Sequence, residues 1–513
     1  MITTRYLLLE TVCYIRAAFT KDQHSAMSSD SRMEMLRDVR QKADGSTRLV
    51  LGIVFFTNFL DNLLLTSVVP IVPSFLLHLD RKEYEEHSNR STPALPPHAN
   101  DSVPLTLVDD SFAKHAFSLA AVANSENSRV GWLLSSKAIV QLVANPFVGP
   151  LCSRLGYPIL LFGGCSIMFV SSLAFAVSQT FIPLLVARAL QGLGSAASAV
   201  AGMSIVAERY PDDRGRSKAM GIALGGAAVG ILVGYPYGGF MYTFVGKTVP
   251  FLIIGALTLV DLGLQWFTLG LQPKEGAASA YTPLYVLLQD PYILVASGAV
   301  MLTTMSMAVL EPTVPLWIIS TMHVQKWQLG LVFLPDSVGY LVGTNFFGLA
   351  ARSIGRWVCT LACMLLISLC LFCLPFSTTI PQLTLPHLGL GLGLGITDAA
   401  VMPLLALLVD RRHDSFYGCV YAIVQLAVCL AYSVGPSVAG LIVKSVGFPW
   451  LMRGMAIINL LFSPLCLMLR KASVVTDEDI TLTQARAGPA PQRYAQDDNQ
   501  DTTFSYGRLS EED

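Results

Sequence analysis

Residues 49–79 form an apolar stretch that is long enough to cross a bilayer as one helix. Its one acidic residue, Asp61, lies near the middle, where a carboxylate costs about 2.5–3.5 kcal/mol on insertion scales. Asn58, Asn62 and Thr66 lie at helical spacing from it, so the helix has one polar face. That face must contact protein or a water-filled cavity. It is either a structural polar contact between helices or a site for a cation or a proton.

The overall composition is typical of an integral membrane protein. Hydrophobic residues make up 53% of the 513 residues and charged residues only 13%, against about 25% charged residues in soluble domains. The formal net charge of -1 indicates no nucleic-acid partner. The Cys residues show no spacing typical of a metal site, and no nucleophile–base set is recognisable. We therefore expect that the protein is not an enzyme and that it binds neither a metal nor a cofactor.

Eleven further apolar segments follow the first, which predicts an all-α membrane protein with twelve transmembrane helices. Residues 383–409 are the most ambiguous, because Gly389, Gly391, Gly393 and Gly395 alternate with leucine as in a strand. In an apolar span such glycines favour close helix packing instead. The predicted segments are 129–152, 157–179, 181–207, 216–240, 248–270, 289–320, 326–350, 356–376, 383–409, 416–443 and 447–469.

The distribution of Lys and Arg predicts the orientation in the membrane. Basic residues are concentrated next to the first and last spans and in three loops that fall on one side of the predicted bilayer. Both termini are therefore expected in the cytosol. The three basic loops are 208–218, 350–357 and 410–414.

The segment 80–128 falls on the opposite, lumenal side. It contains sequons at Asn89 and Asn100, which only a lumenal or extracellular loop can use. Its high content of Pro, Ser and Asn and its weak hydrophobic pattern are typical of a disordered segment. We therefore predict a lumenal, mostly disordered loop that is glycosylated at Asn89 or Asn100.

An internal repeat divides the spans into two halves. Pro70 and Pro73, at the end of the first span, recur as Pro312 and Pro315 at the end of the seventh. Two six-helix halves related in this way are typical of a secondary transporter. The predicted domains are a disordered cytosolic segment 1–47, a six-helix bundle 48–270, a central cytosolic loop 271–288, a second six-helix bundle 289–469 and a disordered cytosolic tail 470–513.

Seven motifs along residues 48–470 are specific enough to indicate a family. They are LDNLLLTSVVPIVPSFL, SSKAIVQLVANPFVGPL, VARALQGLGS, LEPTVPLW, KWQLGLVFLP, GTNFFG and IVKSVGFPWLM. These motifs resemble the vesicular monoamine transporters of the major facilitator superfamily, of which the chain would be a diverged member. The segment GPLCSRLG, residues 149–156, resembles the cytosolic loop signature of the superfamily. The segment LGGAAVGILVGYPYGG, residues 224–239, resembles its antiporter motif, whose residues here would be Gly226, Gly230, Gly234, Pro236 and Gly239.

The resemblance implies the major facilitator fold, with two six-helix bundles around a central cavity. It also implies a proton-coupled antiporter that loads cytosolic monoamines of the serotonin, dopamine, noradrenaline and histamine class into acidic secretory or synaptic vesicles by alternating access. The expected partners are a small cationic amine, protons, the lipid bilayer and, functionally, a vesicular proton pump.

Charged residues in the predicted spans carry the expected chemistry. Lys137 shares a helix face with Gln141 and Asn145, and Glu311 shares one with Thr304. An exchanger of protons for a protonated amine needs a buried carboxylate that either ligand can neutralise. Each acid can instead belong to a structural ion pair with a buried base. The charged residues are Asp61, Lys137, Arg188, Glu311, Asp336 and Asp398.

The resemblance implies roles for individual residues. Asp61, Glu311 and Asp398 match family positions that serve amine binding and proton coupling. Aromatic faces suit cations, although a lone aromatic residue on a spanning helix more often serves packing. The expected substrate contacts are Asp61, Asn62, Thr304, Glu311, Trp317, Tyr340 and Tyr432, and the expected charge network is Asp61, Lys137, Arg188, Glu311, Asp336, Asp398 and Gln425.

The chain departs from the family pattern at three of these positions. Gln425 stands where the family has an acid that pairs with the lysine of the second span, here Lys137. Thr304 replaces an Asn, and Asp336 is an acid where the family has Ala. A buried lysine without a counter-charge is unfavourable. We therefore hypothesise that Asp336 or Asp398 compensates the charge of Lys137.

Three functions stay open at this point. The first is the monoamine antiporter, and the second is a vesicular transporter for another organic cation, acetylcholine or a polyamine, or one with altered proton coupling. The third is a non-transporting or channel-like membrane protein that kept the fold. The intact antiporter motif and the retained acids argue against the third, whereas Gln425 and Thr304 keep the second open.

Overall fold

The computed structural model describes residues 46–91, 133–270, 283–322, 332–413 and 416–473, and in these ranges every regular element is a helix. The predicted strand-like segment 383–409 therefore lies in a helix. The helices are α3 (Thr47–Ser91), a helix over residues 133–155, α5 (Tyr157–Val177), α6 (Phe181–Arg209), α7 (Asp213–Val245), α8 (Thr248–Thr268), α9 (Leu284–Leu287), α10 (Pro291–Thr321), α12 (Leu334–Ile354), α13 (Arg356–Cys373), η2 (Leu374–Phe376), α14 (Ile380–Arg412), α15 (Gly418–Val446), α16 (Phe448–Phe462), η3 (Ser463–Met468) and α17 (Leu469–Ser473).

Ten membrane spans are recognised by length and hydropathy among the described residues. The helix over residues 133–155 and α12 occupy the positions of the two other predicted spans, so the helices are consistent with twelve. The prediction is wrong at the end of the first span, because α3 continues through residues 80–91. That stretch is rich in Glu, Lys and Arg, which are good helix formers. Asn89 thus lies in a helix, while Asn100 lies outside the described residues.

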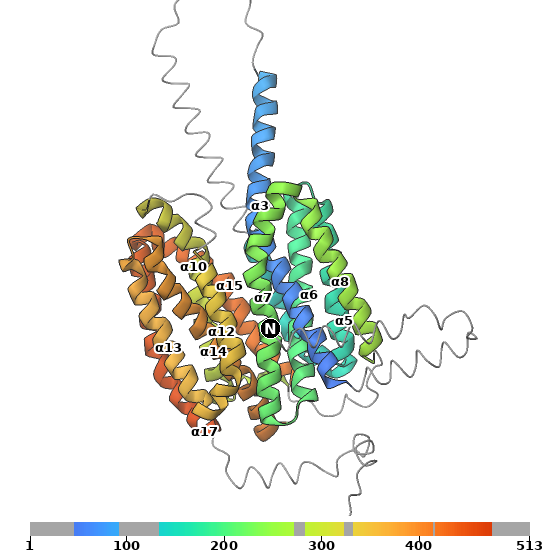
Figure 1. Cartoon of the computed structure of the whole chain (residues 1–513), viewed down its shortest axis with the longest axis vertical. Coiled ribbons are helices and arrows are strands. Elements are labelled where there is room, and N and C mark those ends of the chain that lie inside the picture. Colours follow the sequence, from blue (N-terminus) through green and yellow to red (C-terminus); the bar gives the residue numbers. More distant parts are fainter. Residues whose placement is uncertain (1–45, 92–132, 271–282, 323–331, 414–415, 474–513) are drawn as a thin grey trace, which may run out of the picture. The chain divides into compact units, whose positions relative to one another are not determined.

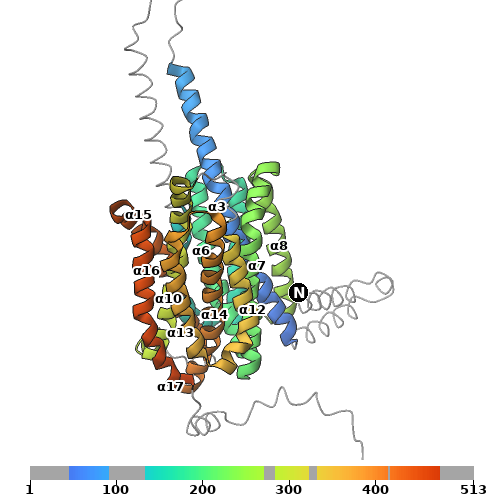
Figure 2. The same cartoon turned by 60° about the vertical axis from the view of Figure 1, so that its left-hand side comes forward.

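The helices form two groups that match the two predicted halves (Figures 1 and 2). In the first group α3 packs against α6 and α7, and α5 packs against α6 and α8. In the second group α12 packs against α14, α10 against α15, and α13 against α14 and α16. The groups meet where α7 contacts α12 and α14, where α6 contacts α15, and where the helix over residues 133–155 packs against α15. The predicted terminal segments lie outside the described residues, except that helix continues to Ser473.

Glycines with left-handed backbone repeat between the two halves. Gly156 and Gly355 separate corresponding helices with φ angles of 84° and 109°, and Gly246 and Gly447 do the same with 87° and 89°. Only glycine adopts such angles without strain, so it permits the tight turn between two antiparallel helices.

Three of the predicted antiporter-motif glycines, Gly226, Gly230 and Gly234, line the face of α7 that packs on α3. A Cβ atom added to Gly226 would overlap the carbonyl oxygen of Phe55, and one added to Gly234 would overlap the hydroxyl of Thr66. Small residues at such positions let two helix backbones approach closely. A Cβ on Gly239 would meet nothing within 4 Å.

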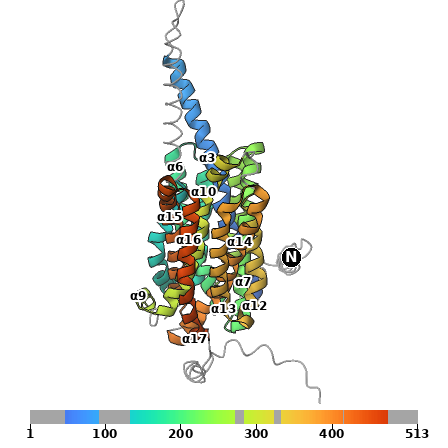
Figure 3. The same cartoon turned by 90° about the vertical axis from the view of Figure 1, so that its left-hand side faces the viewer.

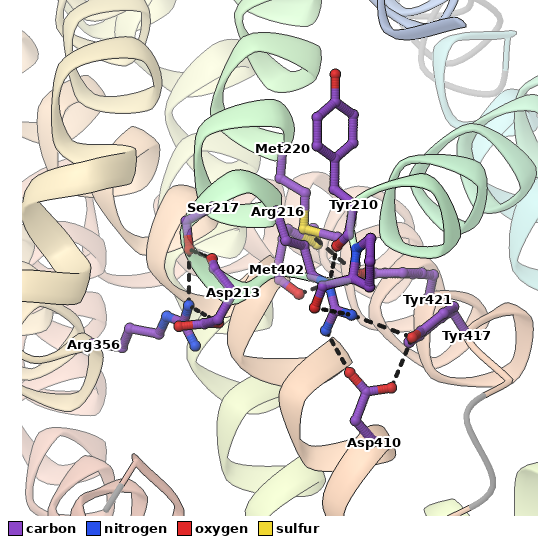
Figure 4. A network of polar contacts seen from close by, with 11 residues as sticks. Tyr210, Asp213, Arg216, Ser217, Met220, Arg356, Met402, Asp410, Tyr417 and Tyr421 are labelled. Carbon is purple, nitrogen blue, oxygen red and sulfur yellow. Dashed lines mark hydrogen bonds and ion pairs between the residues drawn. The ribbon is translucent and has the colours of Figure 1, made fainter. Parts of the chain in front are cut away.

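The buried apolar core is continuous between the two groups at one end only. One cluster combines residues of α3, α6 and α7 with residues of α10, α14 and α15, among them Val54, Met220, Val401 and Tyr421. Towards the other end the buried residues of the described helices separate into a cluster of the first group and a cluster of the second. We call the end with the shared core the basic end, because Arg216 and Arg356 lie there (Figure 4). Arg412, in the last turn of α14, lies at the same end; α14 runs beside α12 (Figure 3).

Candidate functional site

Asp61 of α3 is the centre of a polar cluster in the first helix group. Lys137 Nζ lies 3.3 Å from Asp61 Oδ1, and the hydroxyl of Ser195 donates a short hydrogen bond to the same oxygen. The three residues come from α3, the helix over residues 133–155 and α6, so the cluster depends on how these helices pack. Lys137 is 7% exposed. A buried lysine of this kind is stabilised by its carboxylate partner.

The partner of Lys137 is therefore Asp61, and the hypothesis that Asp336 or Asp398 compensates its charge is wrong for this conformation. Gln425 takes part in an uncharged contact instead, because Gln141 Nε2 donates to Gln425 Oε1 at 3.4 Å. This contact joins the two helix groups by an amide pair where the family pattern has a charge pair.

Arg188 is a buried base of the first helix group. The residue is 2% exposed, and its guanidinium donates to Gln191 Oε1 at 2.7 Å and to the carbonyl oxygen of Leu65 at 3.5 Å. The carboxylates of Asp61 in α3 and Glu311 in α10 favour its charged form.

A second cluster belongs to the second helix group. Tyr340 of α12 donates to Asp398 Oδ2 of α14 at 3.0 Å, and Tyr235 of α7 donates to Glu311 Oε1 of α10 at 3.4 Å. Tyr432 of α15 interacts electrostatically with Glu311, Asp336 and Asp398. The three acids thus face one aromatic-lined region between α10, α12, α14 and α15. Tyr235 was not among the predicted site residues, although an aromatic residue inside the antiporter motif was visible in the sequence.

Two predicted substrate contacts make other interactions in the structure, and a third, Thr304, is buried. Asn62 donates to the carbonyl oxygen of Asn58 one turn earlier. The ring of Trp317 stacks on Phe448 with centroids 4.6 Å apart and an angle of 17° between the rings. In this conformation Trp317 therefore serves packing.

A buried acid that the sequence prediction overlooked is Asp261 of α8. It is 0% exposed and accepts hydrogen bonds from Thr57 at 2.8 Å and from Gln265 at 2.9 Å, with Cys165 at 3.6 Å. The network joins α3, α5 and α8 away from the Asp61 cluster. The available signal was the pair Asp261 and Gln265, two polar residues four apart on one face of an apolar span.

Ion pairs connect the two helix groups at the basic end (Figure 4). Arg216 Nη1 lies 2.6 Å from Asp410 Oδ2, and Tyr417 donates to Asp410 Oδ1 at 2.7 Å. Burial raises the pKa of Tyr417, so its hydroxyl stays neutral and remains a donor. Arg216 also contacts the Tyr417 hydroxyl at 3.3 Å and the Tyr210 carbonyl oxygen at 3.0 Å.

A second ion-pair set lies beside it. Asp213, in the first turn of α7, contacts Arg356 at 2.5 Å and Arg352 at 3.0 Å. Arg356 is buried and also donates to the hydroxyl of Ser217 at 2.8 Å, whereas the side chain of Arg352 is 45% exposed. Together with the shared apolar core, these contacts close the basic end in this conformation.

Known proteins resemble this chain both in sequence and in fold. The sequence matches the Major Facilitator Superfamily over residues 51–418 and, in a second match, over residues 296–494. The human organic anion transporter MFSD10 (TETRAN) has a similar fold, with a TM-score of 0.63 and 16% sequence identity over 82% of this chain and 99% of that chain. At that identity the likeness concerns the fold alone.

Sequence relatives are more specific. The human synaptic vesicular amine transporter is 41% identical over 92% of this chain and 98% of its own length, and the human chromaffin granule amine transporter is 43% identical over 89% and 93%. The rat vesicular acetylcholine transporter is more distant, at 37% identity over 87% and 88%. With helices, buried acids and relatives all in agreement, the chain belongs to the vesicular amine transporter family of the major facilitator superfamily.

Proposed function

We propose that this protein is a proton-coupled antiporter that loads cytosolic monoamines into acidic vesicles by alternating access. The main support is the presence of buried acids in both halves, with Asp61 next to Lys137 and with Glu311 and Asp398 each accepting a hydrogen bond from a tyrosine. The C-terminal acids Glu311, Asp336 and Asp398 have tyrosine neighbours. A protonated amine would supply the missing positive charge, and aromatic faces suit such a cation.

Coupling follows from competition for the same carboxylates. Asp61 and Glu311 can be neutralised either by a proton or by the ammonium group of the substrate. Since one site holds only one of these ligands at a time, binding of a proton on one side of the membrane releases the amine there. Arg188 would transmit a change at one acid to the acid of the other half.

Alternating access requires the basic end to open and close. The pairs Arg216–Asp410 and Asp213–Arg356 join the two halves, so they must separate before a ligand can enter from that end. We infer that the basic end faces the cytosol, in accordance with the positive-inside rule. Both termini would then be cytosolic, residue Asn100 lumenal, and the conformation described above would be the one closed to the cytosol.

Transport into proteoliposomes with an acidic interior tests the proposal. Purified protein should accumulate labelled serotonin or dopamine, and an ionophore that collapses the pH gradient should abolish accumulation. Asp61→Asn, which keeps the volume and removes the charge, should reduce uptake by at least about tenfold. Asp212→Asn is the matched control, because Asp212 caps α7 at the surface and Asn is an equally good cap. Unchanged uptake in the Asp61 variant would contradict the assigned role.

A second candidate is a vesicular transporter for another organic cation or with altered proton coupling. Asp336 favours it, because this acid adds a negative charge next to Glu311 and Tyr432 while Gln425 removes one near Lys137. The same vesicles should therefore be offered labelled acetylcholine and spermidine. Preferential uptake of either compound would replace the monoamine assignment.

A further inference from the structure

His387 of α14 is a buried histidine with no hydrogen-bond partner among the described residues. Its side chain is 0% exposed, and neither Nδ1 nor Nε2 is paired. Its ring lies edge-on to Phe333, with centroids 5.7 Å apart and 86° between the planes. Buried polar groups nearly always have a partner, so an imidazole with two unpaired nitrogens points to a ligand or to a partner reached in another state.

Asp336 of α12 has the complementary property. It is 8% exposed, and its Oδ1 atom has no hydrogen-bond partner within the described part of the chain. A Cβ atom added to Gly391 of α14 would lie 2.7 Å from that oxygen. The carboxylate therefore lies against α14 at the level of Gly391.

The helix periodicity places the side chains of His387 and Asp336 in one seam, the line of contact between α12 and α14. His387 and Gly391 are four residues apart and share a face of α14, while Phe333 and Asp336 are three apart on consecutive turns at the start of α12. The contacts Phe333–His387 and Asp336–Gly391 show that these two faces meet. His387 thus lies about one helical turn, ~5.4 Å, from the level of the Asp336 carboxylate and nearer the end opposite to the basic end. One water molecule can bridge such a separation.

The seam continues towards the interior. Tyr340 follows Asp336 by one turn on α12, interacts with it electrostatically and donates its hydrogen bond to Asp398. The other titratable groups that face Asp336 are Glu311 of α10, Tyr235 of α7 and Tyr432 of α15. Beside His387, α13 contributes Cys370, which lies against Gly389. The order from the helix end inwards is His387, Asp336, Tyr340 and Asp398.

We propose that His387 and Asp336 form a proton-binding pair that passes lumenal protons through Tyr340 to Asp398. The inference rests on the function proposed above. The imidazole takes up a proton from the lumen and gives it to the Asp336 carboxylate. Tyr340 gives its hydroxyl proton to Asp398 and receives the proton of Asp336, so each transfer leaves the intermediate group unchanged. Histidine is suited to the first step, because an imidazole can accept a proton at one ring nitrogen and donate from the other.

Two transport measurements distinguish a role in proton transfer from a role in substrate binding or folding. Uptake driven by an acidic interior requires proton transfer, whereas exchange of labelled for unlabelled serotonin at equal pH on both sides requires none. His387→Asn and Asp336→Asn should each lower gradient-driven uptake by about tenfold, in the range of a lost proton-transfer group. His387→Asn should keep exchange close to that of the unmodified protein, because His387 lies outside the region where the amine would bind.

Three further comparisons complete the test. The double variant should be no worse than either single variant, because both changes interrupt one path. The dependence of gradient-driven uptake on interior pH should change in His387→Asn, while His413→Asn, at the basic end, should retain the profile of the unmodified protein. Unchanged uptake and pH profile in both His387→Asn and Asp336→Asn would overturn the pair, as would a parallel loss of exchange in His387→Asn or additive losses. If the unmodified protein shows neither uptake nor exchange, the proposed function itself fails, and the path with it.

Discussion

Lys137 Nζ lies 3.3 Å from Asp61 Oδ1, with both side chains mostly withdrawn from solvent. The pair joins the helix over residues 133–155 to α3 inside the first helix group. It accounts for a lysine whose expected acid partner is a glutamine in this chain, since Gln425 binds Gln141 instead. The charge balance of Lys137 is thus local to the N-terminal half.

The ion pair should be recognisable in a double-mutant cycle. Lys137→Ala leaves the Asp61 carboxylate with an uncompensated charge, which costs about 3–5 kcal/mol for a buried pair. The variant should therefore unfold at a clearly lower temperature in detergent. The double variant Lys137→Ala/Asp61→Ala removes both charges and should regain much of the loss. Lys218→Ala, at an exposed position, is the control. If the stability loss of the double variant equalled the sum of the losses of the two single variants, a direct pair would be contradicted.

The two arginines that share Asp213 allow a matched test of the closed basic end. Arg356→Ala removes a buried partner and should open this end, whereas Arg352→Ala removes a half-exposed one and should have little effect. Cys419 is a native reporter, because it is 0% exposed in the shared core of the basic end. Its labelling by a membrane-impermeant maleimide, followed by mass spectrometry, should accelerate by at least about tenfold in Arg356→Ala alone. Equal rates in the two variants would show that Arg356 does not hold the end closed.

The glycine face of α7 predicts a difference between two chemically identical substitutions. Gly226→Ala forces a methyl group against the Phe55 carbonyl and should destabilise the protein by about 1–3 kcal/mol, as overpacking does. Gly239→Ala has open space and should be neutral or stabilise slightly, since alanine is the better helix former. Thermal unfolding and the yield of monodisperse protein measure the difference. A Gly226 variant as stable as the Gly239 variant would show that α3 and α7 are less tightly packed than described.

Much of the fold could be predicted from patterns within single segments of the sequence. Spanning helices need a continuous apolar stretch of defined length, so their number and approximate bounds follow from hydropathy without knowledge of neighbours. The same holds for the two halves, whose corresponding turns are marked by Gly156 and Gly355. The end of α3 was missed because residues 80–91 are polar, and a polar helix outside the bilayer leaves no apolar signal.

A charge in an apolar span, by contrast, is easily recognised. This is why Asp61, Glu311 and Asp398 were identified as candidates from the sequence. Asp261 belongs to the same class and could have been found in this way. His387 could not, because one histidine in an apolar span carries no indication of whether its nitrogens find partners.

The sequence by itself therefore determined an all-helical membrane protein of two related halves, its family and the set of buried charges. Only the tertiary structure decided which of these charges pair. Lys137 meets Asp61 because Gly192 of α6 lets the helix over residues 133–155 come close; a Cβ atom there would lie 2.5 Å from the Lys137 carbonyl oxygen. Arg216 meets Asp410 only where α7 and α14 approach at the basic end. Such distances depend on the packing of helices far apart in the chain, whereas hydropathy and helical spacing describe one helix at a time.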